Sequence, residues 1–179
     1  MKKGFLFMAL AAMAFTSCDK VAEIENFAIK NSFEHVLKLD VKDTDPTAFV
    51  NSYTIDLSSD KEFKDNLSKI SGYTLKSLTY RIDKFSGKES TTASGMIQFY
   101  DDADPIGKPI DLGKISFKAM NEAGTVTDLP LSSELKKLLQ DKLMTSKSIT
   151  IRVGGEVSDK PMTADFALAL EIEALVKVK

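Results

Sequence analysis

The feature that most constrains this chain is an alternation of apolar and polar residues at every second position. It recurs in separate stretches from Phe33 to the end of the chain. Because successive side chains of a β-strand point to opposite faces of a sheet, the pattern is typical of strands that bury one face. It predicts about seven strands, whose apolar positions lie within Phe33 to Val41, Phe49 to Leu57, Leu78 to Ile82, Ile97 to Phe99, Ile110 to Phe117, Ile149 to Val153, and Phe166 to Val178.

Two segments have the spacing of helices instead. In the first, Ser59 to Glu62 has the form of a capping box, and a helix is expected from there to a stop at Gly72. The second begins after a cap at Ser132 and carries an apolar stripe, which we expect to be buried against the sheet. The helical apolar positions are Phe63, Leu67 and Ile70 in the first segment and Leu135, Leu138, Leu139 and Leu143 in the second.

Glycines mark two irregular places in this pattern. At Gly113 the apolar positions shift by one residue, which predicts a β-bulge that lets both halves of the strand face the core. The pair Gly154-Gly155 predicts a turn that leads toward the last hairpin.

The composition fits a single domain. With 179 residues, 43% of them hydrophobic, the chain is long enough to bury a core without a disulfide, and it has one cysteine. The predicted fold class is mainly β: an antiparallel β-sandwich or partly open barrel of about seven strands with two short helices, spanning residues 31–179.

Two short echoes suggest an internal duplication. Ser77 to Ile82 matches Ser148 to Val153 position by position, and each follows a predicted helix. Asp43 to Pro46 resembles Asp102 to Pro105 in the same way. Each half would then read strand, acidic turn, strand, helix, strand. Common strand composition explains echoes of this length equally well, so the duplication is a hypothesis.

The N-terminus has the layout of an export signal. Lys2 and Lys3 give a positive start, and an apolar run from Gly4 to Phe15 follows, too short for a stable membrane span. We therefore expect residues 1–17 to be a signal peptide. Residues 18–30 show no clean period and are predicted to form a tether that leads into the domain.

The stretch Phe15-Thr16-Ser17-Cys18 resembles the lipobox of bacterial lipoproteins, and Phe at its first position is similar to the relaxed form in Bacteroidota lipoproteins. The resemblance implies that Cys18 is acylated and becomes the new N-terminus. Each buried CH₂ of an acyl chain contributes about 0.8 kcal/mol, so several chains would anchor the protein without a transmembrane helix. We expect the protein to be anchored in the outer membrane, on either its periplasmic or its surface face. The alternative is a secreted protein with an unmodified Cys18.

The sequence offers little for catalysis. His35 is the only histidine and lies on an apolar position of the first strand, which favours a half-buried side chain over a catalytic base. Gly-x-Ser-x-Gly, His-Glu-x-x-His and phosphate-binding glycine motifs are absent, and one His and one Cys cannot fill a zinc site. We predict a protein that is not an enzyme and needs no cofactor.

Carboxylates are the remaining metal-binding groups. Two acidic clusters lie in predicted turns, and oxygen-rich loops of this kind can hold Ca²⁺ at extracellular affinity. Neither follows the EF-hand pattern, and Asp before Pro is ordinary turn chemistry. A structural turn is the favoured interpretation and calcium the alternative. The candidate residues are Asp43, Asp45, Asp101, Asp102 and Asp104.

Charge and aromatic content restrict the partners. Removing residues 1–17 takes Lys2 and Lys3 from 24 basic residues, so 22 basic and 26 acidic residues remain and the net charge is −4. A surface of this charge excludes nucleic acid as the main partner. Aromatic platforms for sugars typically use Trp, and the chain has none. Tyr73 and Tyr100 are the two aromatic residues predicted to face a ligand.

Three functions follow from these observations. The first is a lipid-anchored cell-envelope protein that acts as a non-enzymatic binding or structural module, with an envelope protein or glycan as partner. The second is a carrier of a hydrophobic small molecule or lipid, held between the sheet and the helix that contains Leu135 and Leu143. The third is a calcium-dependent adhesion or glycan-binding module.

Overall fold

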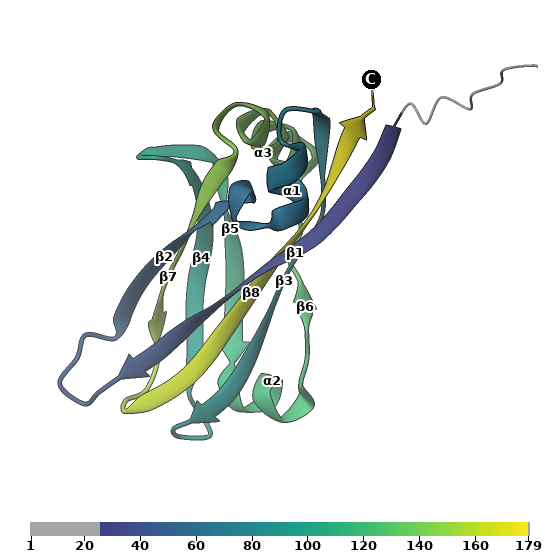
Figure 1. Cartoon of the computed structure of the whole chain (residues 1–179). Helices are drawn as coiled ribbons and strands as arrows, with labels where there is room; N and C mark the ends of the chain where they lie inside the picture. Colours follow the sequence, from purple (N-terminus) through teal and green to yellow (C-terminus); the bar gives the residue numbers. More distant parts are fainter. Residues whose placement is uncertain (1–25, 179) are drawn as a thin grey trace, which may run out of the picture.

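A computed structural model describes residues 26–178 as a sandwich of two β-sheets with short helices at its ends (Figure 1). The mainly β prediction is confirmed, with eight strands in place of about seven, because a two-residue strand forms at Thr127–Asp128. The strands are β1 (Asn26–Val41), β2 (Ala48–Asp56), β3 (Ile70–Ser86), β4 (Thr92–Asp101), β5 (Asp104–Ser116), β6 (Thr127–Asp128), β7 (Ser148–Val157) and β8 (Met162–Lys177). The helices are α1 (Lys61–Asn66), α2 (Phe117–Ala123) and α3 (Ser133–Ser146), and a 3-10 turn, η1, spans Leu57–Ser59.

The strand order defines the architecture. One sheet has the order β1-β8-β3-β6 and the other the order β2-β7-β4-β5, and every pairing is antiparallel. Strand β1 pairs with β8, β2 with β7, β3 with β6 and β4 with β5, as in one long hairpin. This hairpin is rolled up, so that β3 also pairs with β8 and β4 also pairs with β7. This is the order of an eight-stranded jelly roll. The chain thus forms the predicted sandwich and not a closed barrel.

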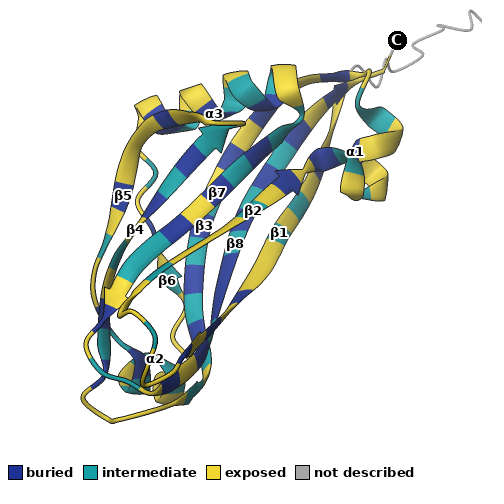
Figure 2. Cartoon of the chain, turned by 90° about the vertical axis from the view of Figure 1, so that its left-hand side faces the viewer, coloured by how far each residue is buried: buried dark blue, intermediate teal, exposed yellow. Residues whose placement is uncertain are grey.

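The core lies between the inner faces of the two sheets, where the alternation of the sequence places its apolar side chains (Figure 2). Strand β8 contributes the most regular row, with fully buried residues at every second position from Leu168 to Val176. Strand β7 faces it from the other sheet with Ile149, Ile151 and Val153. The predicted inward faces of these strands are confirmed.

Helix α3 covers one end of the sandwich as predicted. The Ser132 hydroxyl accepts a hydrogen bond from the Leu135 amide at 3.1 Å, which is the expected N-cap. Leu135, Leu139 and Leu143 are buried, whereas Leu138 is 39% exposed. The predicted stripe therefore packs on the protein's own sheets through three of its four leucines.

The other two helices differ from the prediction. Helix α1 is capped by Asp60, whose carboxylate accepts from the Phe63 amide at 2.9 Å, and it ends at Asn66. Gly72, the predicted stop, lies in β3 beside an irregularity of the ladder. Helix α2 was not predicted, because Phe117 continues the strand pattern of the preceding residues. It ends at Gly124, which adopts the left-handed conformation of a helix C-cap.

Two further expectations are corrected and one is confirmed. Strand β1 begins at Asn26, so residues 26–30 belong to the sheet and not to the tether. Gly154 and Gly155 lie inside β7 and form no turn. The bulge is confirmed, because Gly95 pairs with Gly113 while Met96 pairs with Asp111, and Gly113 has a φ of 64°.

The two sequence echoes have different outcomes. If four is added to each strand number, with the count starting again at one after eight, the order of one sheet becomes the order of the other. Strand β3 is then equivalent to β7, so Ser77–Ile82 and Ser148–Val153 lie on equivalent strands. The acidic turns are not equivalent, since one joins β1 to β2 across the sheets and the other closes the β4–β5 hairpin. The predicted equivalence of the two acidic turns is therefore wrong, although the second half does contain the predicted strand, acidic turn, strand, helix and strand in that order, with α2 and β6 added. A jelly roll has this symmetry whatever its sequence, so the duplication stays a hypothesis.

Candidate functional site

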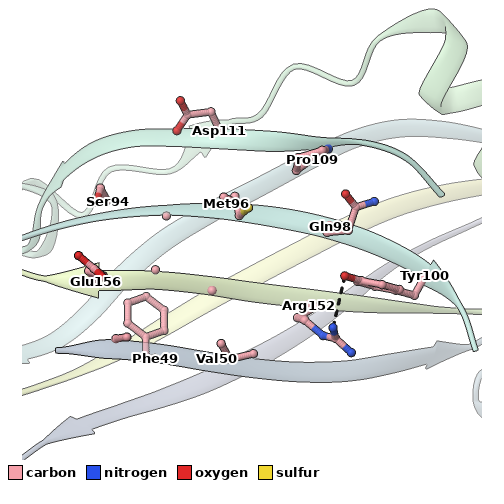
Figure 3. A pocket seen from close by; sticks show the side chains of 14 residues that line it. Phe49, Val50, Ser94, Met96, Gln98, Tyr100, Pro109, Asp111, Arg152 and Glu156 are labelled. Atoms are coloured by element: carbon pink, nitrogen blue, oxygen red, sulfur yellow. Dashed lines mark hydrogen bonds between the residues drawn. The ribbon is translucent and has the colours of Figure 1, made fainter. Parts of the chain in front are cut away.

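The outer face of the β2-β7-β4-β5 sheet carries an open groove of about 620 Å³ (Figure 3). Its side chains come from all four strands of the sheet, so the groove depends on the register of the sandwich. The residues that line it are Ala48, Phe49, Val50, Ser94, Gly95, Met96, Gln98, Tyr100, Pro109, Asp111, Arg152, Gly154, Gly155 and Glu156.

The register arranges these residues in three rows across the sheet. In the middle row, Gly154 of β7 pairs with Val50 of β2 on one side and with Met96 of β4 on the other. Arg152 lies two residues before Gly154 on β7 and pairs with Gln98. Glu156 lies two residues after Gly154 and pairs with Ala48 and Ser94. Rows two residues apart are about 7 Å apart, so the groove presents a basic, an apolar and an acidic row in sequence.

The centre of the middle row is apolar and open to solvent. Val50 is 72% exposed and Met96 is 53% exposed, although both lie within a regular sheet. Gly154 between them has no side chain, and a Cβ placed there would touch Val50 Cγ2 at 3.5 Å, an ordinary contact. Large exposed apolar side chains grouped around a hollow are typical of binding surfaces.

Arg152 forms the basic row. Its guanidinium carbon lies 4.3 Å from the centre of the Tyr100 ring, and its Nη1 donates to the Tyr100 hydroxyl at 3.3 Å (Figure 3). The ring attracts the cation and orients it, while further N–H groups of the guanidinium stay available. Among residues 26–178 no carboxylate lies within ion-pair distance of Arg152. Tyr100 therefore holds the guanidinium in place at one end of the groove.

The opposite end of the groove is acidic. Glu156 is exposed, and in the described part of the chain it takes no part in an ion pair. Asp111 of β5 pairs with Met96, at the edge of the middle row, and one of its oxygens accepts from the Gly113 amide at 2.8 Å. Arg152 and Glu156 are four positions apart, so their Cα atoms lie about 13 Å apart along the strand.

The two tyrosines predicted to face a ligand have different positions. Tyr100 lines the groove, but Arg152 covers one face of its ring. Tyr73 is 5% exposed and stacks on Phe63 of α1 with ring centroids 6.4 Å apart. Its hydroxyl is buried and has no hydrogen-bond partner among residues 26–178, and this burial raises its pKa. Tyr73 is a core residue, which corrects the prediction.

The aspartates proposed for calcium act in turns and ion pairs. Asp101 accepts from Lys142 Nζ at 2.5 Å and from the Ser146 hydroxyl at 3.0 Å, which ties α3 to the end of β4. Asp45 accepts from the Lys42 amide at 2.9 Å within its own turn. Asp43, Asp102 and Asp104 are exposed. In residues 26–178 no cluster of three or more His, Cys, Asp or Glu side chains is arranged to hold a metal ion.

His35 and the N-terminal segment complete the predicted sites. His35 stacks on Tyr53 of β2, with ring centroids 4.2 Å apart and an interplanar angle of 13°. It is exposed, not half-buried as expected. The signal peptide and Cys18 lie outside the described residues. Among residues 26–178 there is no helix with the length and apolar character needed to cross a membrane.

The interior leaves little room for a carried ligand. A hollow between the sheets, beside Leu39, Ala93 and Phe166, has a volume of about 10 Å³. A cavity measured in this way needs about 10 to 15 Å³ to hold one water molecule. The hollows beside α3 are open at the surface, and the larger of two has a volume of about 450 Å³. The groove on the outer face is therefore the better candidate site.

Comparisons with known proteins add little to this description. No protein-family model matches the chain, and no curated protein matches its sequence. Among solved structures, a chain of Desmodium yellow mottle tymovirus is similar over 100% of this chain and 98% of its own, with 10% identity and a TM-score of 0.40. A chain of turnip yellow mosaic virus is similar over 86% and 96%, with 10% identity and a TM-score of 0.43. Scores at this level support no inference about function, so the fold assignment depends on the strand order itself.

Proposed function

We propose that the protein is a lipid-anchored module of the cell envelope that binds a partner through the groove around Gly154 and performs no catalysis. The observation that carries this proposal is the middle row of the groove. The apolar side chains of Val50 and Met96 are exposed to water on either side of Gly154, and the packing of the fold does not require this exposure. Burying such surface against a partner would stabilise the complex by roughly 25 cal/mol per Å².

The groove has the composition of a binding surface and not of an active site. Its polar side chains include one cation and two carboxylates. Ser94 and Glu156 are neighbours on paired strands, but the groove contains no histidine or lysine that could activate a nucleophile. A site of this kind can hold a partner in place, and Ser94 has no histidine or lysine in the groove to activate it.

The anchor follows from the N-terminal sequence. Cys18 would be joined to the domain by the few residues that precede β1, which starts at Asn26. The N-terminus of β1 and the C-terminus of β8 lie at the same end of the sandwich, beside α1 (Figure 1). The groove lies on the flank of the domain, so an anchor at that end would leave it open to partners.

Two measurements test the proposal. Cys18→Ala should move the protein from the membrane fraction to the soluble fraction, and unchanged membrane association would contradict the anchor. A photo-crosslinking amino acid at Met96 should give a discrete adduct in intact cells. The matched control is the same amino acid at Val36, an exposed apolar residue on the other sheet. Equal crosslinking at both positions, or none at Met96, would contradict a partner in the groove.

A further inference from the structure

We propose that the partner of the groove is an extended peptide segment that presents an acidic, an apolar and a basic side chain on one face, at alternate positions. The inference rests on the proposed function and specifies the chemistry of its ligand. Three features of the groove support it: the guanidinium of Arg152, which pairs with no carboxylate of residues 26–178, the apolar hollow at Gly154 and the carboxylate of Glu156.

The spacing of the three rows matches an extended peptide. Arg152, Gly154 and Glu156 occupy alternate positions of one strand, so they face the same side of the sheet. A bound peptide in extended conformation has the same repeat, with alternate side chains about 7 Å apart on one face. A peptide that lies along β7 therefore places one side chain over each row without adjustment of its backbone.

The chemistry of each row selects a side chain. Arg152 is held against Tyr100 and can donate two parallel hydrogen bonds to a carboxylate. The hollow between Val50 and Met96 accepts an apolar side chain, because Gly154 leaves its floor empty. Glu156 at the other end of the groove attracts an ammonium or guanidinium group. The order acidic, apolar, basic follows directly.

A glycan fits the groove less well. Sugar rings typically stack on open aromatic faces, and one face of Tyr100 is covered by Arg152. Phe49 packs against the core as well as lining the groove. The centre of the site is aliphatic and thioether surface, which favours an amino-acid side chain over a hydroxylated ring. We therefore infer a peptide ligand, and the test below distinguishes it from an acidic glycan.

The test is a titration with short peptides, followed in amide NMR spectra of the chain from Asp19 onward. This chain keeps residues 26–178, which form the complete sandwich with its core. The probe is acetyl-Asp-Ala-Leu-Ala-Lys-amide at millimolar concentration. It should shift the amide signals around Arg152, Gly154 and Glu156. Replacing the Leu of the probe by Ser should weaken binding about tenfold.

A charge exchange makes the test specific. Arg152→Glu should weaken binding of the probe at least about tenfold. The same variant should regain affinity for acetyl-Lys-Ala-Leu-Ala-Lys-amide, which a variant that has merely lost its fold would not do. As a matched control, Lys84→Glu reverses a charge on the other sheet and should leave both affinities unchanged.

The outcomes separate the inference from the proposed function. If the peptide leaves the groove signals unmoved, or if the charge exchange gives no recovery, the peptide inference is wrong. If tetragalacturonate shifts the groove signals and the peptide does not, the ligand is an acidic glycan and the proposed function stands. If Met96 also fails to crosslink in cells, the proposed function fails too.

Discussion

Gly95 of β4 and Gly155 of β7 face each other so closely that a Cβ on Gly155 would lie 2.3 Å from the Ser94 carbonyl oxygen and 2.9 Å from Gly95 Cα. Real Cβ atoms do not approach backbone atoms to such distances. The two strands can therefore pair at this point only because both residues lack side chains. This contact lies directly beside Gly154 and holds the floor of the groove in place.

Substitutions at the adjacent glycines should therefore change stability by very different amounts. Gly155→Ala should lower the free energy of unfolding by about 2 kcal/mol, because its methyl group meets rigid backbone. Gly154→Ala should change stability by less than about 1 kcal/mol, since its Cβ meets Val50 at an ordinary distance. Urea denaturation measures both. Equal losses for the two variants would show that the strands are not paired as described.

Neighbouring leucines on α3 give a second comparison. Leu139 is fully buried, and Leu139→Ala should cost about 3 kcal/mol through lost burial and the cavity left behind. Leu138 is 39% exposed, so Leu138→Ala should cost less than about 1 kcal/mol. The two variants have the same effect on helix propensity. A larger loss at Leu138 would mean that the other face of α3 is the buried one.

Removal of a buried hydroxyl should stabilise the core. The Tyr73 hydroxyl is buried and finds no hydrogen-bond partner in the described part of the chain, and an unsatisfied buried polar group costs about 1 to 3 kcal/mol. Tyr73→Phe should raise the free energy of unfolding by about 1 kcal/mol, measured by thermal or urea denaturation. A substantial loss of stability instead would reveal a hydrogen-bond partner for this hydroxyl.

The ion pair between Asp101 and Lys142 should make stability depend on pH. The hydrogen bond from Lys142 holds the pKa of Asp101 below its usual value of 3.8, with a further contribution from Ser146. A lowered pKa in the folded state stabilises the fold at pH values above the usual pKa, and this contribution disappears as the pH falls below it.

Melting temperatures of the parent protein and of Asp101→Asn test this dependence. The parent should melt higher at neutral pH, and the difference should shrink below about pH 4. Asp43→Asn, at an exposed aspartate of the other acidic turn, serves as the control. A difference that persists unchanged at low pH would mean that charge on Asp101 is not what ties α3 to β4.

The fold was largely predictable because burial controls the alternation. Strands with one face in the core, such as β7 and β8, repeat apolar residues at every second position, and the sequence alone reveals them. Helix α2 was missed because Phe117 fits both the strand that precedes it and the helix that it begins. The helical spacing of Phe117 and Met120 before Gly124 was a signal for this helix.

The site was harder to predict because it depends on register. Tyr100 was singled out from its place beside an acidic turn, and it does line the groove. Arg152, Val50 and Met96 were missed, because each is an unremarkable residue on the outer face of its own strand. Only cross-strand pairing brings them together around Gly154, and that pairing is a property of the whole jelly roll. Gly154 itself was taken for a turn residue.

The most direct test of the central claim is whether the groove is covered in the cell envelope. Val50→Cys places a thiol in the middle row, and Val36→Cys places one on the other sheet. The native Cys18 sulfur should not react if it is acylated. We expect a membrane-permeant maleimide to label Cys at position 50 more slowly in intact envelopes than in the purified protein, and to label position 36 equally in both. Equal labelling of position 50 in envelopes and in purified protein would contradict a bound partner in the groove.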